Sequence, residues 1–171
     1  EGQVGTGSTP VASNSTPVSI DNGTTYSKVF AASNQSCGIT TAGVAKCWGN
    51  NTAGNLGTNN QTSPTIGPAL VVDNDFYSEL ALAYDHTCGI TTAGILKCWG
   101  QNNNGQLGLP TTVTATQILV PTPVNTTAHY IKVTAGAQHT CAITTSNVAQ
   151  CFGYNANSYA LGDGDGTIPT R

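Results

Sequence analysis

One thirteen-residue stretch occurs three times in this chain, and it constrains the fold more than any other feature. Each copy starts with a cysteine, carries a second cysteine ten residues later and ends in glycine, over residues 37–49, 88–100 and 141–153. Successive copies begin 51 and 53 residues apart (37 to 88, then 88 to 141). A repeat of this length with strand-like patterning is typical of propeller blades rather than of helical solenoids.

The residues before each copy predict a strand. They are Tyr26–Ala31, Tyr77–Leu82 and Tyr130–Ala135, and each run alternates with period two and contains aromatic or β-branched residues. Each copy is followed by an Asn/Gly-rich loop and then by a Thr/Pro/Ser-rich connection, such as residues 109–127. Proline restricts that connection to an edge strand or an extended linker. No segment predicts a helix.

The sequence therefore predicts one all-β domain of propeller-type blades with antiparallel strands. Residues 1–18 are interpreted as the tail of a preceding blade and an interblade segment, because residues 2–5 match 105–108 and residues 16–18 match 121–124. The expected repeats are 19–68, 69–124 and 125–171, the last including the start of the next interblade segment. Three hairpins lie between two partial blades, so the propeller is either incomplete or assembled from several chains.

Counting inward from the cysteines of the second copy predicts a tight hairpin. If Cys88 faces Cys98, three residues remain as the loop, 92–94. Such a loop needs a left-handed residue at its last position, which glycine adopts freely. The first copy has Gly43 there and the third has Asn147, and asparagine tolerates this conformation better than most residues.

The same register pairs the cysteines. If the pair that closes the loop is hydrogen-bonded, the cysteines form a non-hydrogen-bonded pair with Cα atoms about 4.5 Å apart, within disulfide range. We therefore predict Cys37–Cys47, Cys88–Cys98 and Cys141–Cys151. Three such bridges indicate an oxidising, extracellular or cell-surface compartment. One alternative is six buried free thiols in a cytosolic protein. The other is a zinc site, although the ten-residue separation of the cysteines differs from the spacing of zinc ligands.

Composition argues against two classes of partner. Only 8% of the residues are charged, the net charge is −3 and Lys and Arg number five, so binding to nucleic acid is not expected. No run approaches the roughly 20 apolar residues of a membrane span. The chain begins at Glu1 without a signal-like hydrophobic region, which indicates a mature or trimmed form.

The hairpin and the loop after it resemble a known repeat. The residues that carry the likeness in the second copy are His86–Ile90, Cys98–Asn102 and Gly105–Gly108. They resemble the repeat of the regulator-of-chromosome-condensation family, and more closely its secreted bacterial branch with cysteine-bridged hairpins. The third copy keeps His139-Thr140-Cys141 but has Phe152 in place of tryptophan, and the first has Gln35 in place of histidine.

This resemblance implies four-stranded blades around an axis, usually seven of them. Three repeats cannot close such a ring, and a missing blade leaves sheet edges and one blade face open. Either the chain is a piece of a longer polypeptide, or its partial end blades complete one another between copies. A head-to-tail contact of the second kind gives a ring or, if it does not close, a filament.

Several conspicuous side chains are interpreted as structural. His86 and His139 occupy a position that, in the resembled family, satisfies backbone groups between blades. One repeat position is aromatic in every copy, and we interpret it as interblade packing rather than a ligand cage: Trp48, Trp99 and Phe152. Residues 163–166 read Asp-Gly-Asp-Gly and are interpreted as an acidic turn, because calcium needs six or more oxygens and the EF-hand pattern is absent.

Glycan attachment is permitted by the sequence. Six asparagines begin Asn-x-Ser/Thr triplets: Asn14, Asn22, Asn34, Asn50, Asn60 and Asn125. In a chain so rich in Asn, Thr and Ser, several such triplets arise by chance. The Thr/Ser/Pro-rich connections could equally carry O-linked sugars.

No catalytic constellation is present, and no cofactor or metal is expected. The eight carboxylates form no acid–base pair, and nucleophile-elbow, phosphate-loop and dinucleotide motifs are absent. We expect a non-enzymatic extracellular structural module whose partner is a copy of itself or the rest of a longer propeller. The alternative is a secreted propeller that binds or inhibits a partner protein through its loops, as β-lactamase-inhibitory propellers do. Aromatics clustered on the loops would favour binding, and aromatics buried between blades would favour assembly.

Overall fold

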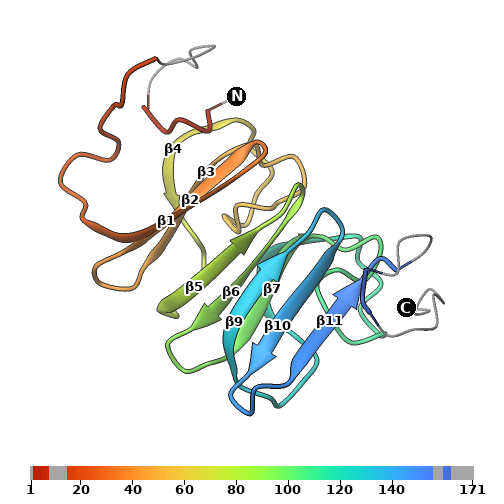
Figure 1. The fold of residues 1–171 in the computed structure, drawn as a ribbon. Coiled ribbons are helices and arrows are strands. Elements are labelled where there is room, and N and C mark those ends of the chain that lie inside the picture. The colour runs from red at the N-terminus through yellow and green to blue at the C-terminus, as the bar shows by residue number, and fades with distance from the viewer. Residues whose placement is uncertain (1, 8–14, 156–159, 163–171) are drawn as a thin grey trace.

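The computed structural model describes residues 2–7, 15–155 and 160–162. Within these ranges the chain forms eleven strands in three antiparallel sheets and no helix (Figure 1). The predicted all-β architecture of propeller-type blades is confirmed.

Each sheet is one blade, with its strands in sequence order. Blade 1 contains β1 (Tyr26–Ala32), β2 (Gln35–Thr40), β3 (Ala45–Gly49) and β4 (Thr65–Leu70). Blade 2 contains β5 (Tyr77–Leu82), β6 (His86–Thr91), β7 (Leu96–Gln101) and β8 (Gln117–Pro123). Blade 3 contains β9 (Tyr130–Ala135), β10 (His139–Thr144) and β11 (Ala149–Gly153).

The blades stand side by side in chain order (Figure 1). Blade 1 touches blade 2 through contacts of β1 and β2 with β5, and blade 2 touches blade 3 through contacts of β5 and β6 with β9. Residues 2–7 lie beside blade 1, at the opposite end of the molecule from β11. Each end blade therefore has one blade neighbour instead of two.

The predicted hairpin geometry is confirmed in every blade. The two cysteines of each hairpin face each other, and the backbone N–H of Thr91 donates to the carbonyl of Ile95 at 2.9 Å to close the loop. The last loop residue is left-handed each time, with φ of +80° at Gly94, +85° at Gly43 and +61° at Asn147. Local turn chemistry alone therefore sets the register of these hairpins.

A disulfide joins each facing pair of cysteines. The bridges are Cys37–Cys47, Cys88–Cys98 and Cys141–Cys151, each with Cα atoms 4.1 Å apart. The first two are fully buried between blades, whereas the third is half-buried on blade 3. Each closes a short loop, which stabilises the fold by about 2–3 kcal/mol on the chain-entropy model.

The proline-containing connections form edge strands, one of the two outcomes that proline allowed. β4 pairs with β3, and β8 pairs with β7. The expected boundary of the first repeat, after residue 68, falls inside β4. The last strand of blade 1 therefore ends two residues beyond that boundary. Composition could not show this, because the end of β4 is set by its pairing with β3. Among the described residues no strand pairs with the outer edge of β11.

The hydrophobic core lies between the blades. One cluster joins blade 1 to blade 2, and its largest members are Ile39, Leu56, Tyr77, Leu80 and Trp99. A second cluster joins blade 2 to blade 3, and its largest members are Ile90, Leu96, Leu107, Tyr130 and Val133. A blade thus buries its apolar faces only by stacking on its neighbours, as in other repeat folds.

Candidate functional site: the seams between blades

The contact between consecutive blades, here called a seam, is made by a loop of one blade lying on the hairpin of the next. Between blades 1 and 2, the Asn55 carbonyl accepts hydrogen bonds from Trp99 Nε1 at 2.9 Å and Thr87 Oγ1 at 2.8 Å. Trp99 is fully buried, and its ring meets that of Tyr77 edge to face with centroids 6.1 Å apart. The interpretation of this aromatic position as interblade packing is confirmed for Trp99.

The seam between blades 2 and 3 has the same construction with one hydrogen bond fewer. Thr140 Oγ1 donates to the Gln106 carbonyl at 2.9 Å, as Thr87 does to Asn55. Phe152 replaces the tryptophan and has no N–H to donate. These seam hydroxyls were not predicted from the sequence, although a Ser or Thr precedes the first cysteine in every copy.

Residues 2–5 occupy the corresponding place on blade 1. The Gln3 carbonyl accepts hydrogen bonds from Trp48 Nε1 at 2.9 Å and from Ser36 Oγ at 3.0 Å. These are the contacts that Asn55 makes on blade 2. Residues 2–5 therefore lie where the loop of a preceding blade would lie.

Glycine ends each of these loops because the aromatic ring of the next blade leaves no room for a side chain. Gly5, Gly57 and Gly108 have φ of +76°, +69° and +61°. A Cβ on Gly57 would lie 2.8 Å from Trp99 Nε1, and one on Gly108 would lie 2.9 Å from the ring of Phe152. The Leu-Gly pair that recurs in the loops is thus required by the seam.

One polar side chain per repeat crosses the seam behind the hairpin. Gln35 Nε2 donates to the Ala83 carbonyl at 3.0 Å, and its Oε1 accepts from Asn55 Nδ2 at 3.0 Å and lies 3.2 Å from Thr87 Oγ1. At the same repeat position, His86 Nε2 lies 2.9 Å from Thr140 Oγ1. The structural role expected for His86 is confirmed, although its partner is a side-chain hydroxyl rather than a backbone group.

The contacts of His86 fix its protonation state. The hydroxyl proton of Thr140 is directed at the Gln106 carbonyl, so Nε2 of His86 is the donor, and in the neutral ring Nδ1 carries no proton. Nδ1 is buried and has no hydrogen-bond partner in the described part of the chain. Burial, with a further contribution from the charge of His139, lowers the pKa of His86 to about 4. His86 is therefore neutral at pH 7.

The end blades leave uncovered the two faces that meet inside the seams. On the side of blade 3 away from blade 2, Ile143 is 38% exposed, whereas Ile90 at the same repeat position is buried. On the side of blade 1 away from blade 2, Val29 is 71% exposed, whereas its equivalent Leu80 is buried. We call the first surface the trailing face (Cys141, Ile143, Ala149, Cys151, Leu161) and the second the leading face (Tyr26, Val29), where Gly38 is buried beneath Tyr26 and Trp48 beneath residues 2–5.

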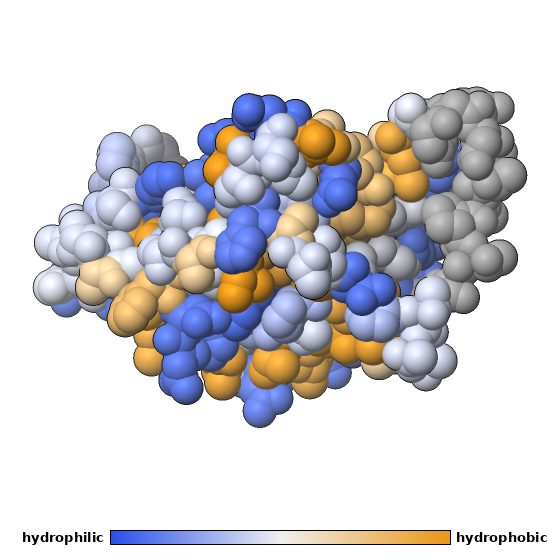
Figure 2. All heavy atoms as spheres, turned by 90° about the horizontal axis from the view of Figure 1, so that it is seen from below, coloured by the Kyte–Doolittle hydropathy of each residue, from blue (hydrophilic) through white to orange (hydrophobic). Residues whose placement is uncertain are grey.

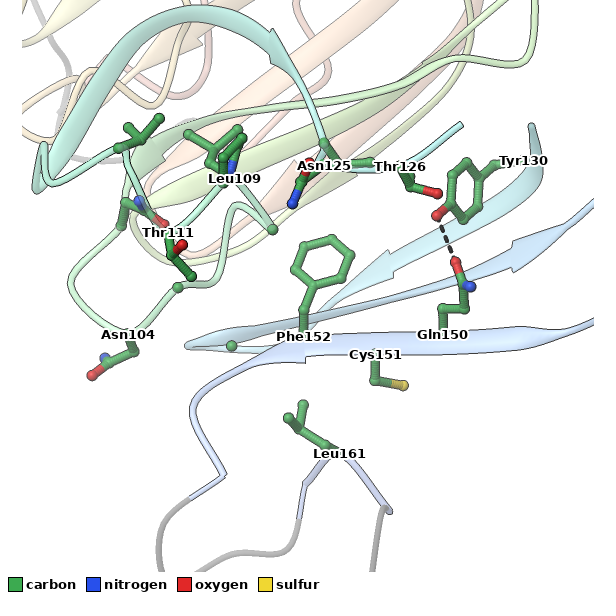
Figure 3. A pocket seen from close by; sticks show the side chains of 17 residues that line it. Asn104, Leu109, Thr111, Asn125, Thr126, Tyr130, Gln150, Cys151, Phe152 and Leu161 are labelled. Atoms are coloured by element: carbon green, nitrogen blue, oxygen red, sulfur yellow. Dashed lines mark hydrogen bonds between the residues drawn. The ribbon is translucent and has the colours of Figure 1, made fainter. Parts of the chain in front are cut away.

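A hollow of about 590 Å³ lies beside β11 (Figure 3). Phe152 projects into it from β11, toward Leu109 and Asn125 of the blade 2 loops, while Cys151 and Leu161 lie on the other side of the strand. The described lining consists of apolar, amide and hydroxyl groups without Asp, Glu, His, Lys or Arg. Such a lining suits a polypeptide segment better than a metal ion or a charged substrate.

A row of charges crosses the blades, and it was not predicted from the sequence. Lys28 and Lys132 both pair with Glu79, at 2.9 Å and 3.4 Å. The three residues hold one repeat position, the second after each strand-opening tyrosine, so aligning the repeats would have revealed them. Both lysines are solvent-exposed and Glu79 is half-buried, so each pair contributes little to stability, at most about 1 kcal/mol.

Aromatic side chains are not clustered on the described loops. Trp99, Tyr77 and Tyr130 are buried in the seams, and Trp48 is buried against residues 2–5. Phe76 and Tyr84 are about half exposed but lie at opposite ends of β5. On the face shown in Figure 2, hydrophobic side chains are dispersed among hydrophilic ones. The described loops therefore carry no aromatic cluster.

The remaining candidate sites are the six asparagines of Asn-x-Ser/Thr triplets and the acidic turn at residues 163–166. Asn22, Asn60 and Asn125 are exposed, Asn34 and Asn50 are half-buried, and Asn14 lies outside the described residues. Glycosylation of these asparagines stays a prediction. Residues 163–166 also lie outside the described ranges, and within those ranges no three His, Cys, Asp or Glu residues are grouped to hold a metal ion. The described residues include no helix of the length and apolarity that crossing a membrane requires.

Comparison with known proteins relates the chain to one repeat family. The Regulator of chromosome condensation (RCC1) repeat matches residues 94–143, and a second description of that repeat matches residues 81–106 and 130–158. The chain is 30% identical over 179 residues to the ultraviolet-B receptor UVR8 of Arabidopsis thaliana. That alignment covers all of this chain and 40% of UVR8.

Solved structures share the fold. Yeast RCC1 (Prp20), solved bound to Kap60, superimposes with a TM-score of 0.74 at 20% identity over 82% of this chain and 34% of that chain. Human WBSCR16 gives 0.71 at 18% identity, over 79% of this chain and 34% of that chain. The ectodomain of the Arabidopsis thaliana receptor kinase ACR4 gives 0.53 at 17% identity, over 82% and 41%. Together with the repeated hairpin, loop and seam, these matches show that the chain belongs to the RCC1 repeat family.

Proposed function

We propose that this chain is a non-enzymatic structural module of an extracellular assembly, in which copies join head to tail through their end blades. The observation that carries the proposal is the pair of uncovered faces. The trailing face of blade 3 and the leading face of blade 1 are the two halves of a seam that forms twice inside the chain. A second copy therefore carries a surface of the required shape and chemistry.

The disulfides support the extracellular part of the proposal. A cross-strand bridge in every hairpin forms and persists in an oxidising compartment and is rare in the cytosol. The likeness in fold to the ACR4 ectodomain is compatible with such a location. Low charge and a surface rich in Thr, Asn and Ser are also compatible with it.

The assembly is heterologous, because two different faces of the chain meet. Such a contact closes into a ring or continues as an open filament. The family usually closes a ring of seven blades, and seven is not a multiple of the three blades in each copy. We therefore expect either a ring of another blade number or an open filament.

One loop must move when two copies join. The Leu56 N–H bonds to Asn51 Oδ1 at 3.0 Å, and the Leu161 N–H bonds to Asn155 Oδ1 at 3.1 Å, so Leu161 is the seam leucine of blade 3. In the incoming copy, Val4 occupies the position of the seam leucine against that copy's own blade 1. Since Val4 belongs to a segment already bonded to Trp48, we expect residues 160–162 of the first copy to be displaced.

Light scattering coupled to size-exclusion chromatography tests the proposal. Mass should rise with protein concentration for the unmodified chain. Ile143→Asp would bury an unpaired carboxylate in the contact, which should weaken association at least about 30-fold while barely affecting the monomer. Ile95→Asp is the matched control, because Ile95 is 40% exposed in the hairpin turn of the middle blade, outside both end faces.

A monomeric mass at every concentration would overturn the proposal. Equal effects of the two substitutions would also contradict it, because they would show that the trailing face has no special part in association.

The alternative function is binding of a different protein through the loops. The loop-lined hollow beside β11 supports it, and yeast RCC1 has been solved bound to Kap60. We prefer assembly because the aromatic side chains that usually anchor such interfaces lie buried in the seams.

A further inference from the structure

We infer that Asn22 is a modification site, at which the side-chain amide is lost spontaneously through attack by the backbone nitrogen of Gly23. The reaction needs only water and converts Asn22 into aspartate and isoaspartate. It takes place in the turn that leads into β1 and does not depend on the assembly proposed above.

The turn around Asn22 leaves both reacting groups free. The Thr24 N–H donates to the Asp21 carbonyl at 3.0 Å, which closes the turn over Asn22 and Gly23. Within the described part of the chain, neither the Gly23 N–H nor the Asn22 side chain makes a hydrogen bond. Asn22 is exposed, and the position that a Cβ of Gly23 would take has nothing within 4 Å. The Asn22 side chain can therefore turn toward the Gly23 nitrogen.

The step is an acyl transfer within the chain. The Gly23 nitrogen bonds to Asn22 Cγ and gives up its proton, and the side-chain nitrogen takes up a proton and leaves as ammonia. Water then opens the resulting cyclic imide, at Cγ to give aspartate or at the backbone carbonyl carbon to give isoaspartate. Ring closure is favoured because the groups are held together and glycine has no Cβ to obstruct their approach.

An exposed asparagine in blade 2 shows what protects such a site. Asn74 follows Asp73 there, as Asn22 follows its own aspartate in blade 1. The next residue is Asp75 instead of glycine, and its N–H donates to Asp73 Oδ1 at 3.2 Å. The side chain of Asp75 and this hydrogen bond both hinder attack, so Asn74 should keep its amide.

The chain has one other Asn-Gly pair, Asn104-Gly105, and there the nitrogen is bonded. The Gly105 N–H donates to the Asn102 carbonyl at 3.2 Å, and Asn104 is half-buried. This hydrogen bond has to open before the nitrogen can attack. We therefore expect Asn104 to react at least about fivefold more slowly than Asn22 in the folded chain.

Loss of the amide acts on the ion pair beside Asn22. Asp21 Oδ2 accepts hydrogen bonds from Lys46 Nζ at 2.6 Å and from Tyr26 Oη at 2.7 Å, which tie the turn to β3 and β1. A new carboxylate at residue 22 lies next to Asp21 and competes with it for Lys46. Isoaspartate also adds a backbone carbon to the turn. The reaction therefore loosens the attachment of this turn to blade 1.

Peptide mass spectrometry of the full chain during incubation at mildly alkaline pH tests the site. The protein is produced without N-linked glycans, because Asn22 begins an Asn-x-Thr triplet. Aspartate and isoaspartate should accumulate first at residue 22, with isoaspartate identified by enzymatic methylation, while Asn74 and Asn104 remain intact. In reduced protein unfolded in urea, Asn104 should react as fast as Asn22, because both are followed by glycine and neither nitrogen is protected.

Two variants test the consequence for blade 1. Asn22→Asp reproduces the added charge and should lower the midpoint of thermal unfolding relative to Asn22→Gln, which keeps an amide. Equal rates at Asn22 and Asn104 in the folded chain, or faster reaction at Asn74, would overturn the inference. So would an Asn22 amide that survives in the folded chain for as long as Asn104 does. Equal midpoints for the two variants would overturn the effect on blade 1.

Discussion

At the residue scale, the buried side chain of His86 makes the stability of the folded chain depend on pH. His86 is neutral in the folded chain because burial lowers its pKa to about 4, whereas an unfolded histidine titrates near 6.5. The unfolded chain therefore takes up the proton first as pH falls. The contribution of neutral His86 to the stability of the folded chain is complete above about pH 6.5. It is lost as the pH falls from about 6.5 to about 4.

We predict that the free energy of unfolding falls by about 2–3 kcal/mol over that range because of His86. Urea unfolding of the monomer at pH 7, 5.5 and 4.5 measures this. His86→Gln provides the control, because Gln35 fills the same position in blade 1, and this variant should lose that part of the pH dependence. The same slope in both proteins would contradict the assignment.

Glycine at the end of each hairpin is a second residue-scale requirement. Gly100 has φ of +102°, and a Cβ there would collide with the Asp85 carbonyl and lie 2.8 Å from the Cα of His86. Gly100→Ala should therefore destabilise the chain by about 3 kcal/mol or more. Gly105→Ala controls for backbone strain alone, with φ of +71° and open space around it, and should cost about 1 kcal/mol. Equal losses in thermal or urea unfolding would show that the collision does not matter.

At the scale of elements, the hairpins could be predicted and the fourth strands only in part. The hairpin is local, so the nine residues between the cysteines and a left-handed Gly or Asn determine its register. The end of β4, by contrast, depends on pairing with β3 residues about twenty positions earlier. The row formed by Lys28, Glu79 and Lys132 depends on contacts between repeats, about fifty residues apart. No single repeat marks such contacts, and only an alignment of the three repeats shows that these charges share one position.

The three disulfides should differ in reactivity although their hairpins are alike. Cys141–Cys151 is half-buried on the trailing face, whereas the other two are sealed in seams. In dilute protein, mild reductant should open Cys141–Cys151 first, because access limits thiol attack. Differential alkylation followed by mass spectrometry identifies the opened bridge. At concentrations that favour assembly this bridge should become protected, and simultaneous opening of all three would contradict the account.

At the scale of the whole molecule, head-to-tail joining places like charges together. The row of charges alternates within the chain, but Lys132 of one copy would meet Lys28 of the next. Raising ionic strength from 0.1 to 1 M shortens the screening length from about 10 to about 3 Å, so association should strengthen. Light scattering across that range measures it, and Lys132→Gln should reduce the salt effect. Weaker association of the unmodified chain at high salt would count against this junction.

The central claim is that the seam inside the chain forms again between chains. Electron cryo-microscopy of the concentrated protein tests it most directly. The account predicts a ring or filament in which the leading face of each copy covers the trailing face of the previous one, with Val29 buried near Ile143. Separate three-blade particles at every concentration, or copies joined through any other surface, would contradict it.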